Sequence, residues 1–404
     1  MDPRPPVRPP GAAAAHRQPA PGAPAPAFAR VNGARMSSPG FSRNVNGFRG
    51  LCVSLVFLHH VAHSGLPPAA DPESLWQLAL QDLFMSFGYG VELFFMISGY
   101  VIVQSLRRHA SVGGFLADRA LRIFPVWLPL GLVLGIACVV VGKLGFVASE
   151  PAWWLPVVLA NLALLPPLVP LPLVHPASWS LSYEWLFYLA CAALALWSRS
   201  ATRSRIVLVL WIVAAAWLIA AIPRSLFFLP GVALALAPSV FAPLQRATWL
   251  GAFSLPLMLA CWYSTGIFAA QFGTPLWSVV AAGQGIAVLV ALLAGTHVFA
   301  CVGAPDDAGW PLLRSRAAQH LGRISYSFYL MHPVAMAVVK PIVVRTVPEG
   351  WPATLVFLAA SALVSWALAY ASWALLEQRF ARWLKSRGTA PASGTAALPQ
   401  GQSA

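Results

Sequence analysis

The chain has 404 residues, of which 58% are hydrophobic and only 9% are charged, and its mean hydropathy is +0.70. Soluble domains carry about 25% charged residues, so this composition excludes an ordinary soluble enzyme and indicates a polytopic membrane protein. The net charge of +14 does not indicate nucleic-acid binding, because the basic residues fall in short patches between apolar segments, as the positive-inside rule predicts.

The two ends of the chain differ from its middle. Residues 1–44 are rich in proline, alanine, arginine and glycine and hold almost no large apolar side chains. Such a segment cannot bury enough surface to fold, so we expect a disordered cytoplasmic tail there and a second one at residues 387–404. Met36, within the first tail, is a candidate for the true start of translation, and the sequence leaves this open. Residues 45–386 are expected to form one membrane domain.

Apolar segments of helical length recur along this domain, and they predict an all-α fold with about ten transmembrane helices. With the amino terminus inside, alternation places most arginines in cytoplasmic loops, so both termini are expected to be cytoplasmic. Arg224 is one of the few cations assigned to the opposite side. The predicted spans are residues 48–64, 83–105, 121–142, 180–197, 206–222, 225–241, 249–270, 276–301, 325–345 and 352–376.

Residues 153–174 interrupt this pattern, because they are apolar but contain five prolines and an asparagine. Counted as a further span, they would place the arginines of residues 199–205 outside. We interpret them as a re-entrant or interfacial segment, which is tolerated only where its backbone is buried in protein or faces water. Because the segment directly precedes a polar cluster at residues 178–188, it is in a position to cover a substrate site.

The first predicted span carries Arg49 and, eleven residues later, His60. Eleven helical steps make about three turns, so the two side chains share one face, about 16 Å apart along the axis. If Arg49 lies at the membrane surface, His60 lies near the middle of the hydrocarbon core, where an ionisable residue is a candidate functional group. The alternative is a histidine that only hydrogen-bonds across helices. His59 points about 100° away and is expected to pack.

Further polar clusters stand out in the apolar background, and each has a structural alternative. Glu92 and Glu184 lie within apolar spans, where interhelical hydrogen bonds or a neutral buried acid would also explain them. Arg119 and Arg122 share a helical face at a predicted cytoplasmic boundary, which the positive-inside rule alone would also explain. His332 adds a histidine inside a late span.

Taken in order, these clusters resemble the acyltransferase 3 family of integral membrane enzymes, which includes bacterial O-antigen and Nod-factor acetylases. The resemblance runs from about residue 49 to residue 380. Glu92 stands where many relatives have aspartate, which preserves the charge, and the chain is similar to members that lack a fused hydrolase-like domain. The matching elements are Arg49 with His60, residues 90–100, Arg119 with Arg122, Ser180 to Glu184, and residues 325–332.

The resemblance implies an O-acyltransferase of the inner membrane, with cytoplasmic acyl-CoA, most often acetyl-CoA, as the donor. The acceptor would be a hydroxyl of a carbohydrate or another cell-envelope molecule. His60 is implied as the general base, Arg119 and Arg122 as the clamp on the donor, and Arg49 as a second cation near the donor. The remaining expected site residues are Glu92 and Glu184 as catalytic groups, and Ser180, Tyr183 and His332 as substrate contacts, with no metal.

The chemistry of the residues is consistent with this interpretation but less specific. Acyl transfer to a hydroxyl needs a base and a stabiliser for the developing oxyanion, and histidine suits the first role. A nucleotide-bearing donor cannot enter lipid, so its anchor should be cationic. The alternative is a transporter or flippase for an anionic or polyprenyl-linked envelope precursor, in which intramembrane charges and broken helices are also expected. No internal repeat is visible between the halves. The acceptor, the acyl length and the oligomeric state stay open.

Overall fold

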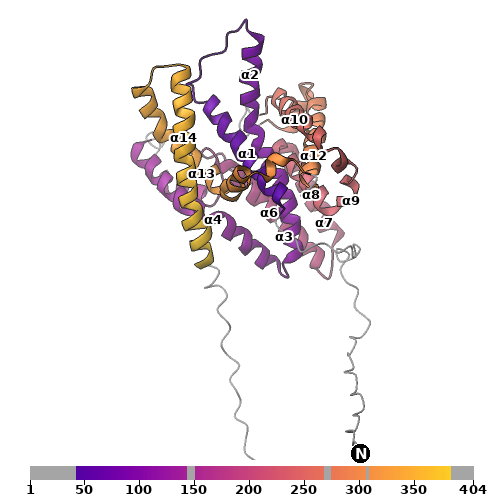
Figure 1. Cartoon of the computed structure of the whole chain (residues 1–404). Coiled ribbons are helices and arrows are strands. Elements are labelled where there is room, and N and C mark those ends of the chain that lie inside the picture. The colour runs from indigo at the N-terminus through magenta and orange to yellow at the C-terminus, as the bar shows by residue number, and fades with distance from the viewer. Residues whose placement is uncertain (1–41, 143–150, 268–273, 306–308, 384–404) are drawn as a thin grey trace, which may run out of the picture. The chain divides into compact units, whose positions relative to one another are not determined.

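The computed structural model describes residues 42–142, 151–267, 274–305 and 309–383. The two expected tails lie outside the described residues except for residues 42–44, and so does Met36. The described parts are helical and contain no strand, which confirms the prediction of an all-α polytopic fold (Figure 1). The α-helices are α1 (Arg43–Ala62), α2 (Leu75–Ser86), α3 (Gly90–Arg108), α4 (Val112–Val141), α5 (Trp154–Leu162), α6 (Ser178–Arg199), α7 (Arg205–Ala221), α8 (Phe228–Leu236), α9 (Pro238–Phe241), α10 (Gly251–Ser264), α11 (Leu276–Ala281), α12 (Gly285–Val302), α13 (Arg316–Thr346) and α14 (Trp351–Ser372). A π-helical turn, η7 (Trp373–Phe380), continues α14, and a 3-10 turn, η4 (Pro223–Phe227), precedes α8.

Helix α1 begins five residues before the predicted span at residues 48–64. Ser42 caps it, because its hydroxyl oxygen accepts a hydrogen bond from the Val45 N–H that no helical carbonyl can reach. Asn46 is buried in the first turns, and its side-chain amide donates to the Gln319 carbonyl at 2.9 Å. Polar residues therefore extend the helix here, because each finds a partner inside the protein.

Seven helices of the described chain are long and apolar enough to cross a membrane. The number is eight if α7 and the η4–α8 segment, which bend by 114° at their junction, form one broken span. Helix α10 has 14 residues and α11 has six, and at 1.5 Å per residue both are shorter than a hydrocarbon core of about 30 Å. The segments predicted as spans are thus largely helical, but the number of about ten spans is not confirmed.

Residues 153–174 do not form a spanning helix. The nine-residue helix α5 is followed by an irregular segment, and the Asn161 side chain at the end of α5 bonds to the backbone at the far end of that segment. The Asn161 side chain donates to the Pro172 carbonyl at 2.9 Å and accepts from the Val174 N–H at 3.0 Å. The indole N–H of Trp127 on α4 donates to the Leu162 carbonyl at 3.2 Å. The protein therefore satisfies these backbone groups, which is the condition for a re-entrant segment, and the membrane depth of this segment stays a prediction.

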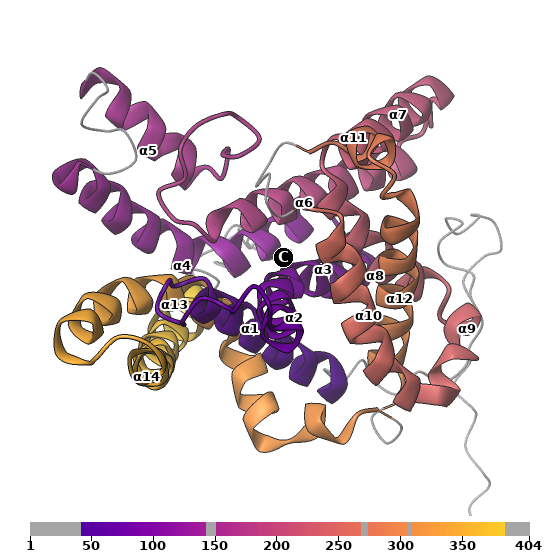
Figure 2. The ribbon, with the colours of Figure 1, turned by 90° about the horizontal axis from the view of Figure 1, so that it is seen from above.

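Helix α1 lies in the middle of the bundle and runs alongside α13 in the same direction (Figure 2). The parallel direction follows from pairs whose numbers rise together: Asn46 with Gln319, Arg49 with Ser325, His60 with His332, and Ser64 with Lys340. The two helices approach closely at Gly322, where a Cβ atom would come within 1.9 Å of the Asn46 carbonyl oxygen. Only glycine fits there, and this close contact sets the register of both helices.

Helix α3 packs on the other side of α1 and continues into a second group of helices. Helix α8 lies along α3, again in the same direction, because the numbers rise together in two pairs: Glu92 with Arg224, and Arg107 with Ala235. The two helices approach closely at Gly99 and Gly231, where a Cβ atom would come within 2.2 Å of the Phe228 carbonyl oxygen and 1.9 Å of the Met96 carbonyl oxygen. Helices α10 and α12 pack against each other beyond α8, as Figure 2 shows. On the α13 side, α14 covers the bundle and brings the η7 turn back towards α4.

Candidate active site

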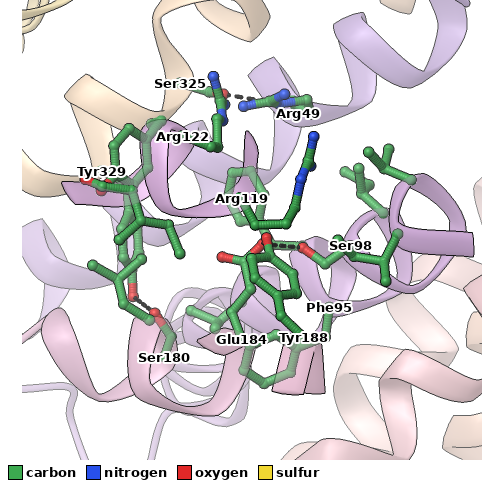
Figure 3. A pocket seen from close by; sticks show the side chains of 18 residues that line it. Arg49, Phe95, Ser98, Arg119, Arg122, Ser180, Glu184, Tyr188, Ser325 and Tyr329 are labelled. Atoms are coloured by element: carbon green, nitrogen blue, oxygen red, sulfur yellow. Dashed lines mark hydrogen bonds between the residues drawn. The ribbon is translucent and has the colours of Figure 1, made fainter. Parts of the chain in front are cut away.

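A pocket with a cavity volume of about 100 Å³ lies between α1, α3, α4, α6 and α13. Arginines gather on one side of it, Glu184 lies beside Ser98 and Tyr188, and the Ser180–Tyr329 pair forms another part of the wall (Figure 3). Helices that are distant in sequence thus build one site. Of the residues predicted from sequence, the pocket wall contains Arg49, Arg119, Arg122, Ser180 and Glu184.

The three arginines keep donors available towards the pocket. Arg49 donates from Nε to the Ser325 hydroxyl at 3.1 Å and forms no ion pair with a described carboxylate. Arg119 contacts the Asp118 carboxylate at 2.5 Å, and its buried Nε–H finds no hydrogen-bond partner in the described chain. Since a buried donor without a partner costs free energy, an anion bound here would relieve it. An arginine has five N–H donors in a fork that matches phosphate.

Arg122 forms an ion pair with Glu377, a residue on η7 that does not line the pocket. Its guanidinium donates to the Glu377 carboxylate at 3.1 Å and lies over the Tyr326 ring at 5.3 Å. Glu377 also accepts from the Ser327 hydroxyl at 2.6 Å and is only 6% exposed. The Arg122 side chain is 34% exposed, so this pairing fixes its direction while leaving part of it accessible.

Glu184 is a carboxylate in the pocket wall that is bonded only by hydroxyl groups among the described partners. Ser98 on α3 donates to its Oε1 at 2.6 Å, and the Tyr188 hydroxyl one turn further along α6 donates to the same oxygen. Neither contact is an ion pair, and the same pocket wall also contains three arginines.

The Ser180–Tyr329 pair connects the pocket to the histidines. The two hydroxyl oxygens are 2.9 Å apart, and each also lies 3.2 Å from the Ala177 carbonyl oxygen, where it can donate. On α13, Ser325, Tyr329 and His332 follow each other at spacings of four and three residues and therefore share one helical face. The Tyr329 ring is 5.9 Å from the His332 ring. His60 and His332 are not among the residues that line the pocket, and Tyr329 connects its wall to them.

His60 and His332 form a pair, and backbone carbonyls determine which ring nitrogens carry protons. A carbonyl only accepts, so the 2.8 Å contact to the Val56 oxygen puts the proton of neutral His60 on Nδ1. The 3.2 Å contact to the Phe328 oxygen does the same for His332. His332 therefore turns the lone pair of Nε2 towards His60 Nδ1, 3.4 Å away. The lone pair of His60 Nε2 stays available, on a ring that is half-buried.

The predicted face of α1 is confirmed, because Arg49 and His60 both contact α13. His60 lies in the last turn of α1, two residues before its end, whereas Arg49 lies six residues inside its start. If α1 spans the membrane, His60 is therefore closer to the far end of the helix than to its middle. His59 is buried, with Nδ1 2.9 Å from the Met85 carbonyl and Gly88 against its ring, so it packs as expected.

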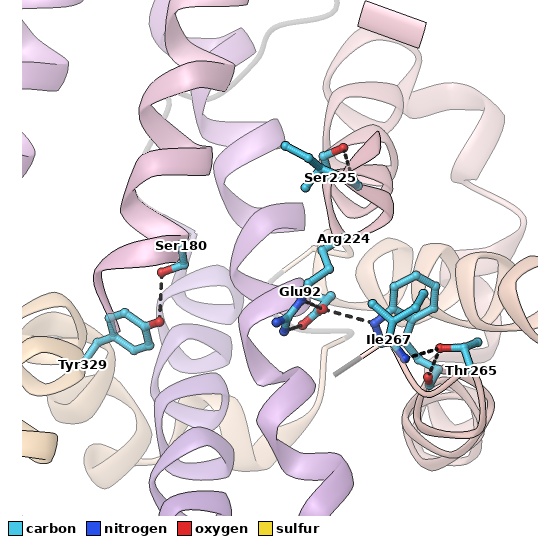
Figure 4. Close-up of polar contacts among 9 residues, drawn as sticks. Glu92, Ser180, Arg224, Ser225, Thr265, Ile267 and Tyr329 are labelled. Atoms are coloured by element: carbon cyan, nitrogen blue, oxygen red, sulfur yellow. Dashed lines mark hydrogen bonds and ion pairs between the residues drawn. The ribbon is translucent and has the colours of Figure 1, made fainter. Parts of the chain in front are cut away.

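Glu92 lies outside the pocket wall. It is fully buried on α3 and forms a two-pronged ion pair with Arg224, at 2.5 and 3.0 Å (Figure 4). The indole N–H of Trp262 donates to the same carboxylate at 3.1 Å. Arg224, assigned from sequence to an external loop, is instead buried in η4 over the ring of Trp179 at 4.0 Å. Tyr183 is also buried outside the pocket wall, packed edge-on against Trp179.

Residues 42–370 match the acyltransferase 3 family, described as an acyltransferase domain. The chain belongs to the acyltransferase 3 family. It is 26% identical to acyltransferase MdmB of Streptomyces mycarofaciens over 320 residues, which cover 72% of this chain and 77% of that protein. It is 30% identical to exopolysaccharide production protein ExoZ of Rhizobium meliloti (strain 1021) over 327 residues, which cover 76% and 94%. No solved structure matches the chain.

The structure brings together further polar residues that sequence reasoning did not assign to the site. Ser98, Tyr188 and Tyr329 lie inside the quoted motifs but were given no role. Glu377 follows the last predicted span by one residue, and a carboxylate at the end of an apolar span was the feature of the sequence that could have identified it. His175 lies in the proline-rich segment before α6, is fully buried, and had no distinguishing motif of its own.

Proposed function

We propose that the protein is an O-acyltransferase that moves an acetyl group from cytoplasmic acetyl-CoA to a hydroxyl of a carbohydrate or another cell-envelope acceptor. The observation that carries the proposal is a pocket lined by three arginines and by Tyr329, whose ring lies against His332, which in turn contacts His60 and its available ring nitrogen. The arginines suit an anionic donor, and the histidine suits proton transfer from an alcohol. Family membership favours acyl transfer over the alternative of transport.

The arginine side of the pocket fits the phosphates of coenzyme A. Arg119 and Arg122 offer guanidinium donors that pair well with phosphate, and Arg49 adds a third cation. The cavity of about 100 Å³ is smaller than the roughly 300–1,000 Å³ of sites that enclose a whole ligand. We therefore infer that the nucleotide stays at the arginines and that only the narrow pantetheine arm passes inwards, towards Tyr329 and the histidines.

In the proposed reaction, the proton of the acceptor hydroxyl is transferred to one nitrogen of His60. His60 Nε2 takes the proton of the acceptor hydroxyl while its oxygen attacks the thioester carbonyl carbon. The carbonyl electron pair moves onto oxygen, and the hydroxyl groups of Tyr329 and Ser180 are candidate donors to that oxyanion. When the pair returns, the C–S bond breaks, and the leaving thiolate takes the proton from His60. His332 Nε2 keeps the His60 ring oriented throughout.

The location of His60 supports approach of the acceptor from the side opposite the donor. His60 is half-buried in the last turn of α1, whereas the arginines lie near the other end of the bundle. Basic residues concentrated at that other end favour a cytoplasmic location for it, and with it cytoplasmic termini and an inner-membrane protein. The name of the relative ExoZ, an exopolysaccharide production protein, supports a carbohydrate acceptor.

The test uses purified protein in micelles that contain octyl β-D-glucoside, whose sugar hydroxyls are the acceptor probe. Acetyl-CoA is added, and the released thiol and the acetylated glucoside are measured. Loss of a general base typically lowers a rate by roughly 10²- to 10⁴-fold, so His60→Ala should bind acetyl-CoA but transfer almost nothing. His59→Ala should keep most of the activity, because His59 faces Met85 instead. Equal release by wild type and His60→Ala, or no release above protein-free micelles, would contradict the proposal.

A further inference from the structure

His175 is a buried histidine whose two ring nitrogens both bond to backbone groups. It precedes α6 by three residues, and its ring lies edge-on against Trp127 at 6.2 Å. Nε2–H donates to the Leu330 carbonyl at 2.9 Å, and Nδ1 accepts from the Ala177 N–H at 3.0 Å. Burial lowers the pKa of His175 to about 4, so at neutral pH the ring is uncharged and its one donor and one acceptor are both used.

The Leu330 carbonyl belongs to the turn of α13 that carries His332. The residue after His332 is Pro333, which has no N–H and whose ring crowds the Tyr329 carbonyl four residues earlier. The helical hydrogen-bond ladder is therefore interrupted at Tyr329, between the Phe328 and Leu330 carbonyls. Two histidine side chains supply hydrogen bonds in the same turn. His332 donates to the Phe328 carbonyl, and His175 donates to the Leu330 carbonyl from a different part of the chain.

Within this turn, the direction of His332 decides its contact with His60. The Nε2 of His332 meets His60 Nδ1 at 3.4 Å, at the long end of hydrogen-bond distance, so a small shift of the turn would separate the rings. His175 is outside the pocket wall and does not contact the arginines. Its bond to Leu330 ties the α13 turn to the segment before α6. Its other bond leads to Ala177, whose carbonyl oxygen lies within reach of the Ser180 and Tyr329 hydroxyls of the pocket wall.

We propose that His175 is a positioning residue that holds the Leu330 carbonyl, and thereby the turn that presents His332 to His60. The proposal rests on the acyl-transfer function assigned above. Loss of the bond to Leu330 leaves donor binding at the arginines intact and disturbs the geometry of the base. A misplacement on the order of 1 Å costs about 10²-fold in rate, so the effect appears in kcat and leaves the KM for acetyl-CoA unchanged.

Two conservative variants separate the two bonds of the ring. The side-chain nitrogen of glutamine occupies about the position of histidine Nε2, so His175→Gln keeps a donor for Leu330. The side-chain oxygen of asparagine occupies about the position of Nδ1, so His175→Asn keeps only the acceptor for the Ala177 N–H. We expect His175→Gln to retain kcat within a few-fold and His175→Asn to lose roughly 10²-fold, with equal KM and equal thermal stability.

The matched control is His320→Asn, which changes a histidine on α13 that bonds to Trp366 outside the pocket wall. It should keep both kinetic constants. If His175→Asn keeps the wild-type kcat, or if the Gln and Asn variants lose kcat equally, His175 does not act through Leu330 and the inference fails. That outcome is distinct from failure of the proposed function. The proposed function fails if wild type and His60→Ala release thiol equally, or if wild type releases none.

Discussion

Glu92 and Glu184 are two carboxylates inside the same bundle, and their surroundings give them different properties. Glu92 is fully buried and accepts hydrogen bonds from Arg224 and Trp262, so its charge is neutralised within the protein. Among the described residues, Glu184 accepts from hydroxyl groups only, and it lines a pocket together with three arginines. Glu92 therefore connects α3 to the η4 segment, whereas Glu184 presents its carboxyl group to a pocket that a ligand could enter.

The arginines show the same difference. Arg224 is 6% exposed, uses two of its nitrogens on Glu92, and lies between the rings of Trp179 and Tyr89. Arg119 keeps a buried Nε–H for which the described part of the chain offers no partner, and Arg122 stays 34% exposed. A charged residue inside an apolar span is thus a structural tie when its partner is inside the protein. It is a candidate ligand contact when donors remain unused.

The largest effect is expected from breaking the buried ion pair between Glu92 and Arg224. Glu92→Ala leaves the Arg224 charge buried without its partner, and removal of one partner of a buried pair typically costs about 3–5 kcal/mol. We expect the variant to reach the membrane in much lower amount and to unfold at a lower temperature in micelles. Fluorescence-detected size exclusion and thermal unfolding measure both.

The control for this prediction removes both charges. A Glu92→Leu, Arg224→Leu double variant leaves no unpaired buried charge, so it should recover much of the stability that Glu92→Ala loses. If Glu92→Ala folds with wild-type stability but transfers no acetyl group, then Glu92 acts in the chemistry, as the sequence pattern suggested, and the comparison between the two carboxylates is wrong.

The second prediction concerns the arginines with unused donors. Replacing both Arg119 and Arg122 by alanine should raise the KM for acetyl-CoA by roughly 10- to 100-fold with little change in kcat, because a phosphate contact is equally strong in the ground and transition states. Initial rates over a range of acetyl-CoA concentrations measure it. Arg224→Ala is the matched control and should instead lower the amount of folded protein. Unchanged donor kinetics in the double variant would leave the pair with a topological role only.

Sequence patterns predicted the elements of this site better than their pairing. The face shared by Arg49 and His60 followed from helical periodicity, because a regular helix fixes which residues lie on one side. The ion pair of Glu92 did not follow, because its partner Arg224 lies 132 residues away in a segment whose sequence is typical of a loop. Spacing within one helix is local information, whereas the partner of a buried charge depends on how distant helices pack.

The same limit applies to the span count and to His175. The hydropathy of residues 249–270 suits a membrane helix, but the helix ends after 14 residues, at Ser264. His175 bonds to Leu330, 155 residues later in the chain, and no periodicity connects the two. Apolar composition shows that a segment is buried, but lipid and protein bury it equally well, so composition alone does not give the number of crossings.

The smallest expected effect sharpens the comparison at Glu184. Glu184→Gln keeps the size of the side chain and an oxygen that accepts from Ser98 and Tyr188, so stability should change by about 1 kcal/mol or less. It removes a negative charge from a pocket lined by three arginines, so an anionic donor should bind more tightly. We expect the KM for acetyl-CoA to fall by about two- to tenfold, and more at low salt than at high salt, because salt screens the charge that was removed. Steady-state rates at two ionic strengths measure both effects. A charge that only opposes donor binding affects the ground and transition states alike, so it changes KM and not kcat. If the kcat of the variant instead falls about a hundredfold while its KM stays unchanged, Glu184 takes part in the reaction itself.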